Sequence, residues 1–83
     1  MTLTPEQSRS ARGLLDWSQE ELAARSNLSG STIRDFEKGR RVPGPNNLAA
    51  VRAALEAAGI QFLSPGDAAI GPGVAWANPP SRS

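Results

Sequence analysis

The residues best equipped for binding chemistry in this sequence are basic, and they gather in its middle. The cluster comprises Arg34, Lys38, Arg40, Arg41 and Arg52. The last third of the chain, by contrast, is almost uncharged. The formal net charge of +1 is too small by itself to identify a class of partner. The clustering is more informative, because a local excess of guanidinium and ammonium groups forms the kind of patch that binds phosphate.

Catalysis and metal binding have few residues to draw on. The chain contains no Cys, which excludes disulfides and thiolate metal sites, and no His, the commonest metal ligand and general base. No Ser has a base to activate it, and the carboxylates mostly occupy positions that cap helices or pair with cations. We therefore expect no enzymatic activity, no metal and no cofactor. No apolar run is long enough to span a bilayer, and none has the secretory pattern, so we expect a cytoplasmic protein.

The stretch over residues 18–38 has the pattern of two short helices joined by a tight turn. Ser18 followed by Glu21 is the capping-box arrangement that starts a helix. Asn27 tolerates the left-handed backbone of a sharp turn, and Ser29 offers the next N-cap. Two helices joined by three or four residues form the helix-turn-helix geometry. The second helix is expected to pack its apolar edge inward and to leave its polar side exposed.

The same stretch resembles a known family. The shared positions are Gln19, Leu22, Ala23, Leu28, Ser29, Ile33, Phe36, Glu37 and Gly39. This pattern is similar to the DNA-binding domain of the lambda and 434 repressor and Cro family, also called the XRE family, over roughly residues 5–58. Asp16 and Asn27 depart from it, since relatives often have Gly there, but Asp and Asn readily accept the left-handed conformation. The resemblance implies a mostly α fold, a small four-helix lambda-repressor-like domain.

A helix is predicted before this unit, over residues 5–15. Thr4 and Gln7 form a capping box, with a proline between them at the first helical position. By resemblance to the family, Arg12 on this helix is expected to form a structural ion pair with Glu37, which would tie the first helix to the end of the third. The alternative is that Arg12 contacts phosphate.

A loop and a fourth helix are expected after the unit. Gly39 is expected to end the third helix, and residues 40–45 are expected to form the loop because their two prolines cannot continue a helix. Asn46 and Asn47 then begin the fourth helix, whose apolar residues recur at helical spacing. Gly59 is expected to end it.

The last third predicts a short C-terminal β-hairpin over residues 60–78. Two short strand patterns flank a stretch rich in Gly, Pro and Asp. Because an isolated hairpin is only marginally stable, Phe62 and Trp76 need a surface to cover, which is either the helical core or the same hairpin of a second subunit. We therefore divide the chain into a helix-turn-helix domain over residues 1–59, the hairpin as a candidate dimerisation element, and a disordered tail over residues 79–83.

The resemblance implies that the third helix lies in the major groove of DNA, which admits a helix and shows a distinct pattern for each base pair. The expected base-reading residues are Gly30, Ser31, Thr32, Arg34 and Asp35. By resemblance, Ser31 and Arg34 contact bases, and Arg34 can donate two hydrogen bonds to a guanine. The expected phosphate-binding residues are Ser18, Gln19, Lys38, Arg40, Arg41, Asn46 and Asn47. The alternatives are an ordinary charged loop for Arg40 and Arg41, and a solvated helix residue for Asp35.

These expectations lead to a sequence-specific DNA-binding transcriptional regulator, most simply a repressor, that binds an inverted-repeat operator as a homodimer. One alternative is an antitoxin that regulates its own operon and binds a toxin partner. Another is a protein-interaction module that has kept the fold without binding DNA. The basic cluster argues against the last of these. The expected partners are double-stranded DNA, a second copy of the chain and, for an antitoxin, a protein; no membrane is involved.

Overall fold

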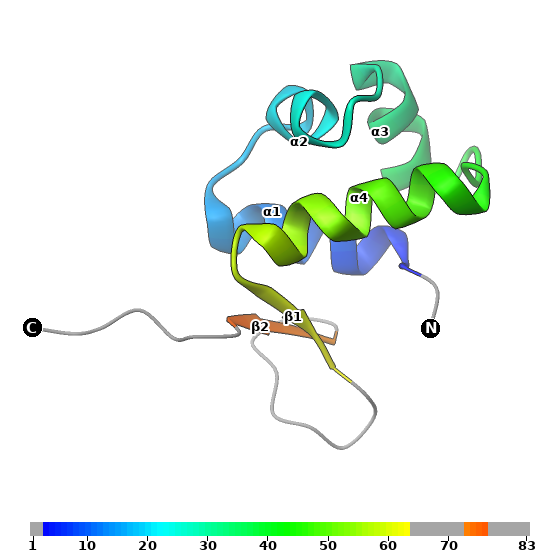
Figure 1. The fold of residues 1–83 in the computed structure, drawn as a ribbon. Helices are drawn as coiled ribbons and strands as arrows, with labels where there is room; N and C mark the ends of the chain where they lie inside the picture. The colour runs from blue at the N-terminus through cyan, green and yellow to red at the C-terminus, as the bar shows by residue number, and fades with distance from the viewer. Residues whose placement is uncertain (1–2, 64–72, 77–83) are drawn as a thin grey trace, which may run out of the picture.

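The computed structural model describes residues 3–63 and 73–76, which form four helices followed by a two-stranded antiparallel sheet (Figure 1). The elements are α1 (Pro5–Leu15), α2 (Gln19–Ser26), α3 (Gly30–Glu37), α4 (Pro45–Ala57), β1 (Ile60–Phe62) and β2 (Val74–Trp76). In Figure 1, α2 and α3 lie above α1 and α4, and the hairpin lies below them. The mostly α fold with a short hairpin, predicted from the sequence, is confirmed.

Polar side chains start the first two helices. At α1 the capping box is complete: the Thr4 backbone N–H donates to Gln7 Oε1 at 3.0 Å, and the Gln7 N–H donates to Thr4 Oγ1 at 3.1 Å. At α2 Ser18 Oγ accepts from the Glu21 N–H at 3.0 Å. The Glu21 carboxylate, however, pairs with Arg25 at 2.7 Å. The other hydrogen bond of the predicted capping box, from the Ser18 backbone N–H to the Glu21 carboxylate, is therefore wrong, because a cation one turn along the helix competes for the carboxylate.

Two left-handed residues end α1 and α2. Asp16 has φ 57° and Asn27 has φ 60°, so the conformation predicted at these two departures from the family pattern is confirmed. After Asn27, the Leu28 N–H donates to the Ala23 carbonyl at 2.8 Å and closes the turn. This turn lets α3 cross α2 within a few residues, as the helix-turn-helix geometry requires.

Three helix boundaries differ from the prediction by one residue. The C-cap of α4 is Ala58, and Gly59, the predicted end of this helix, follows it at φ 103°. The C-cap of α3 is Lys38, and Gly39 follows it in the left-handed region at φ 75°. Helix α4 begins at Pro45 with Gly44 as its N-cap, one residue before the predicted start at Asn46. The reason is that proline has the φ angle of a first helical residue, where its missing N–H leaves no hydrogen bond unmade.

One hydrophobic cluster joins all the elements. Its buried members are Leu3, Ala11, Leu22, Ala23, Ile33, Phe36, Leu48, Val51, Leu55, Ile60 and Val74. Leu22 of α2, Ile33 of α3 and Leu55 of α4 are fully buried. Because these three side chains meet in one core, the rotation of α3 about its own axis is fixed.

The hairpin covers the underside of this core. Its strands pair with Ile60 opposite Trp76 and Phe62 opposite Val74. Strand β1 contacts α4, strand β2 contacts α1, and both Ile60 and Val74 are buried. Phe62 and Trp76 pack against the core but are only partly buried. The predicted tail, residues 79–83, lies outside the described residues.

Candidate nucleic-acid interface

Helix α3 presents a polar side to solvent because its apolar side is anchored in the core. Ile33 and Phe36 are 0% and 2% exposed. Ser31, Arg34 and Lys38 are exposed. These three residues are spaced by three and four positions, so they form one continuous stripe along the helix. We call Ser31, Arg34 and Lys38 the polar stripe.

The first turn of α3 is ordered by a cluster of hydroxyl groups. Ser29 Oγ accepts from the Thr32 backbone N–H at 3.2 Å, and it lies 3.1 Å from Ser31 Oγ and 2.8 Å from Thr32 Oγ1. Gly30, Thr32 and Asp35 are half-buried. The predicted base-reading residues therefore share one helix, and among them the Ser31 side chain is more accessible than that of Thr32.

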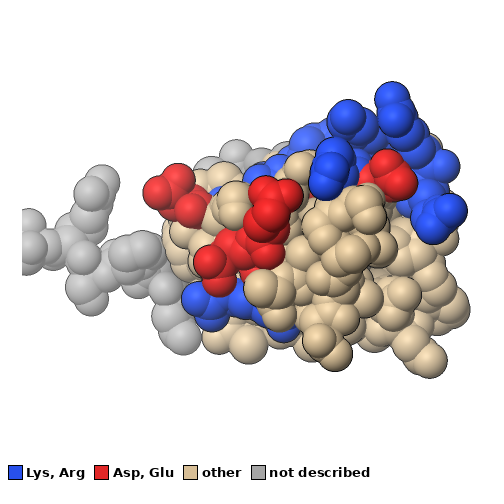
Figure 2. Space-filling view, turned by 90° about the horizontal axis from the view of Figure 1, so that it is seen from above, with Lys and Arg blue, Asp and Glu red and all other residues tan. Residues whose placement is uncertain are grey.

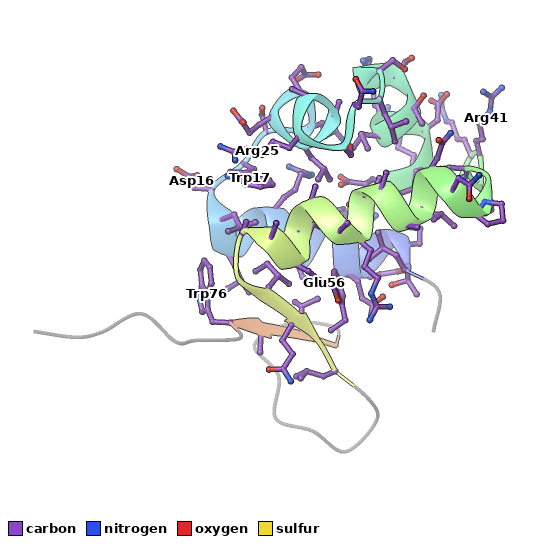
Figure 3. All side chains as sticks on the ribbon, viewed as in Figure 1. Asp16, Trp17, Arg25, Arg41, Glu56 and Trp76 are labelled. Atoms are coloured by element: carbon purple, nitrogen blue, oxygen red, sulfur yellow. The ribbon has the colours of Figure 1, made fainter. Side chains whose placement is uncertain are left out.

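Basic side chains gather over α3 and the loop that follows it, whereas acidic side chains gather over α2 (Figure 2). Lys38, Arg40 and Arg41 are exposed, and Arg41 points outward from the loop between α3 and α4 (Figure 3). Asn46 and Asn47 are also exposed and lie in the first turn of α4. These residues, all predicted to bind phosphate, are thus exposed on the chain segment that runs from the end of α3 into the first turn of α4.

The two predicted phosphate-binding residues of α2 have partners within the protein. Ser18 uses its hydroxyl to cap the helix. The Gln19 amide Nε2 donates to Glu37 Oε1 at 3.2 Å. An anion would therefore contact α2 mainly through the backbone N–H groups of its first turn, because the first N–H groups of any helix lack intrahelical acceptors.

Arg52 belongs to the basic cluster in the sequence, but in the structure its side chain makes contacts within the protein. Its Nε lies 3.2 Å from Glu56 Oε2, and its guanidinium lies 4.9 Å from the centre of the Phe62 ring. It therefore links α4 to the hairpin. Glu56 is labelled in Figure 3, on the side of α4 that faces the hairpin, away from α2 and α3.

A buried carboxylate anchors the end of α3. The Glu37 side chain is 1% exposed and accepts from Arg12 Nη2 at 2.6 Å, from Arg12 Nε at 2.9 Å and from Ser8 Oγ at 2.5 Å. The Gln19 amide is a further donor to it. Arg12 Nη1 also donates to the Trp17 carbonyl at 3.0 Å. One charge pair with its hydrogen bonds thus joins α1, the start of α2 and the end of α3.

Sequence reasoning missed two members of this network. Ser8 stands four residues before Arg12, so both side chains lie on one face of α1, and that spacing was a signal. Arg9 donates to the backbone carbonyl of Glu37. No sequence pattern indicates that contact, because every residue has a carbonyl.

The network keeps both partners charged. Burial raises the pKa of the Glu37 carboxyl, but the hydrogen bonds that it accepts, led by those from Arg12, outweigh burial and hold the pKa below its ordinary value. The hydrogen bond to Glu37 raises the pKa of Arg12. At neutral pH the pair is therefore an ion pair in a site with little access for water.

Arg25 also stabilises the region around the turn. Its guanidinium lies 4.5 Å from the centre of the Trp17 ring, and the two side chains lie side by side in Figure 3. Trp17 links α1 to α2, and the stacked cation covers part of its ring.

The described residues contain neither a metal site nor a membrane-spanning helix. Within residues 3–63 and 73–76, no three acidic side chains come together as ligands for a metal ion. None of the helices in those ranges is long and apolar enough to cross a membrane. The exposed side of α3 with its basic surroundings is therefore the strongest candidate site in the described part of the chain.

Comparisons with known proteins agree with this geometry. The helix-turn-helix family model matches residues 9–60. The fold is similar to the solution structure of the DNA-binding domain of the P22 C2 repressor (residues 1–76), with a TM-score of 0.58 and 26% sequence identity, covering 68% of this chain and 75% of that chain. A search of curated proteins gave no match. The chain belongs to the helix-turn-helix family, in the XRE type that its sequence pattern predicts.

Proposed function

We propose that the protein is a sequence-specific DNA-binding transcriptional regulator, most simply a repressor. The observation that carries this proposal is the polar stripe of α3, which points to solvent because Ile33 and Phe36 hold the other side of the helix in the core. The major groove of B-form DNA is about 12 Å wide and admits a helix presented in this way. The likeness to a repressor's DNA-binding domain supports the same function.

We assign base reading to the outward side of α3. Arg34 is exposed, so its guanidinium is available to donate two hydrogen bonds to a guanine. Ser31 can donate to or accept from a base edge, and Gly30 permits close approach of the backbone. Thr32 and Asp35 are half-buried, so we give them supporting roles at the edge of the contact.

We assign the phosphate contacts to the residues around α3. The set is Ser18, Gln19, Lys38, Arg40, Arg41, Asn46 and Asn47. Because Gln19 donates to Glu37, the contact from α2 is expected chiefly through backbone N–H groups at its positive end. Each phosphate that a cation neutralises releases counterions, so affinity is expected to fall as the salt concentration rises.

A single domain of this kind contacts one half-site, so we propose that two copies bind an inverted repeat. Phe62 and Trp76 are the proposed dimer contacts, since both are partly exposed on the hairpin. The Arg52 guanidinium covers one face of Phe62, and both rings pack partly against the core, so a partner would contact the parts of Phe62 and Trp76 that remain exposed. Repression then follows most simply from blocking access of the polymerase to the promoter.

An antitoxin is the second candidate, and it requires a surface for a protein partner. An open groove of about 440 Å³ is lined by Leu3, Val42, Pro43, Pro45, Leu48, Ala49 and Arg52. Val42 at this groove is 78% exposed, and exposed apolar patches commonly mark protein contacts. Co-expression with the product of a neighbouring gene, followed by copurification, separates an antitoxin from a simple regulator.

Binding of the full chain to duplex DNA at several salt concentrations tests the proposal. We expect the logarithm of the affinity to fall linearly with the logarithm of salt, with a slope of about −0.9 per neutralised phosphate. Selection from a randomised duplex library should enrich an inverted repeat. If no duplex showed salt-dependent affinity, the protein-interaction module would replace the regulator. If the protein does bind an inverted repeat, genomic occupancy mapping would identify the operator and the regulated genes.

A further inference from the structure

An acidic side chain of α2 lies against the start of the polar stripe. Glu20 is exposed, and its Oε2 lies 3.2 Å from the point that a Cβ on Gly30 would occupy. Arg34 Nη2 lies 3.9 Å from the same point, on the side chain one turn further along α3. A carboxylate and a guanidinium thus approach the first residue of α3 together, in the space that glycine leaves open.

A carboxylate at this place is unfavourable against most of what DNA presents. Phosphates repel it, and the major-groove edges of guanine and the thymine O4 offer only acceptors. The donors in that groove are the N4 amino group of cytosine and the N6 amino group of adenine. Because every base pair carries one of these amino groups, a carboxylate held at the base-reading surface favours the orientation of a pair that turns its amino group, rather than the acceptors of guanine or thymine, toward it.

We propose that Glu20 is a specificity-determining residue, which accepts a hydrogen bond from the amino group of a cytosine or adenine at or beside the base pair that Arg34 reads. This inference rests on the proposed function and adds a contact from α2, an element to which that function gives only phosphate contacts. Gly30 is the residue that makes the contact possible. A methyl group 3.2 Å from the carboxylate oxygen would be closer than ordinary packing and would displace the flexible end of Glu20.

The neighbouring Glu21 provides a matched control. It lies in the same first turn of α2 and carries the same charge, but its carboxylate pairs with Arg25 at 2.7 Å. The variants Glu20→Gln and Glu21→Gln each remove one negative charge and preserve side-chain size. Both should strengthen binding to unrelated sequences by a similar small factor, since both reduce repulsion of phosphate. They differ in what they do to base preference.

Selection of the full chain and of both variants from a randomised duplex library tests the inference. We expect Glu20→Gln to reduce the preference at one base pair by roughly tenfold and Glu21→Gln to leave every preference unchanged. Equal preferences in all three proteins, with selective binding by the unchanged chain, would overturn the inference alone. If the unchanged chain bound no duplex, the proposed function and this inference would both be wrong.

A second variant approaches the same contact from α3. Gly30→Ala should fold normally, because Gly30 is a helical residue without a positive φ and because the atom nearest to the new methyl is the end of a flexible side chain. We expect it to reduce the same base preference as Glu20→Gln, and the double variant to lose little more than either. Additive losses in the double variant would mean that Gly30 acts independently of Glu20 and would overturn the assigned geometry.

Discussion

Arg12 Nη2 and Glu37 Oε1 lie 2.6 Å apart, and this pair connects α1 to the last residue of α3. The Arg12 side chain is 18% exposed and the Glu37 side chain 1%. The pair lies behind the polar stripe rather than on it, because Glu37 immediately follows the buried Phe36. The residues proposed to read DNA therefore lie on a helix whose C-terminal end is held in place by this charge pair.

Replacement of Arg12 by Met would keep most of the apolar stem but leave the Glu37 carboxylate without its cation. We expect the free energy of unfolding to fall by about 3 kcal/mol, at the low end for a broken buried pair because two other donors remain. Arg25→Met is the control, since its pair with Glu21 and its stacking on Trp17 are both at the surface and together should contribute only about 1 kcal/mol. Urea denaturation measures both variants. Equal losses would show that Glu37 does not depend on its cation.

Acidification should weaken the fold through Glu37. Its folded-state pKa lies below the ordinary value of 4.5, so its contribution to stability is complete above about pH 4.5 and is lost as the pH falls through the folded-state pKa. The free energy of unfolding should therefore decline more steeply below about pH 4.5 in the unchanged protein than in Glu37→Gln. Urea titrations over a series of acidic pH values provide the comparison. Parallel curves would mean that other carboxylates account for the acid sensitivity.

Arg34→Ala should relax base preference without abolishing binding. The side chain is exposed in the polar stripe, so its removal should leave the fold intact while eliminating about 1–3 kcal/mol of discrimination at one base pair of each half-site. Selection from a randomised library, with thermal unfolding as the control for folding, measures the effect. A uniform loss of affinity with unchanged preference would reassign Arg34 to phosphate.

Arg41→Ala should produce the opposite pattern. Arg41 is exposed and points outward from the loop after α3 (Figure 3), and it is one of the residues proposed to contact phosphate. We expect affinity for all sequences to fall and the slope of log affinity against log salt to become shallower by about 1. Titrations of one specific and one unrelated duplex at several salt concentrations check this. An unchanged slope would support the alternative in which Arg41 belongs to an ordinary charged loop.

The sequence predicts the local features of the fold well, because they depend on neighbouring residues. Ser18 and Ser29 cap helices through their own hydroxyl groups, and Asp16 and Asn27 take left-handed conformations that few other residues tolerate. The exposed side of α3 follows from the spacing of its apolar residues alone. Each of these predictions needed only a few adjacent positions.

Contacts between distant elements could not be predicted in the same way. Leu3 is 4% exposed, although nothing in its immediate sequence distinguishes it from a loose terminus. Arg52 appears in the sequence as part of the basic cluster. In the structure its guanidinium instead stacks on the ring of Phe62, which belongs to the hairpin. Glu20 appears as an ordinary charge in a first helical turn, and its place beside Gly30 depends on the angle between α2 and α3.

The hairpin can either cover the helical core or join two copies of the chain, and substitutions of two valines distinguish these roles. Val74 is 0% exposed on β2, which contacts α1, whereas Val42 is 78% exposed in the loop before α4. Val74→Ala removes buried methyl groups and should lower the free energy of unfolding of the monomer by about 2 kcal/mol, while Val42→Ala should change it little. Urea denaturation at low protein concentration, with the solution mass measured in parallel, tests this. If Val74→Ala left the monomer as stable as Val42→Ala does and reduced only the mass, the hairpin would serve assembly and not the core.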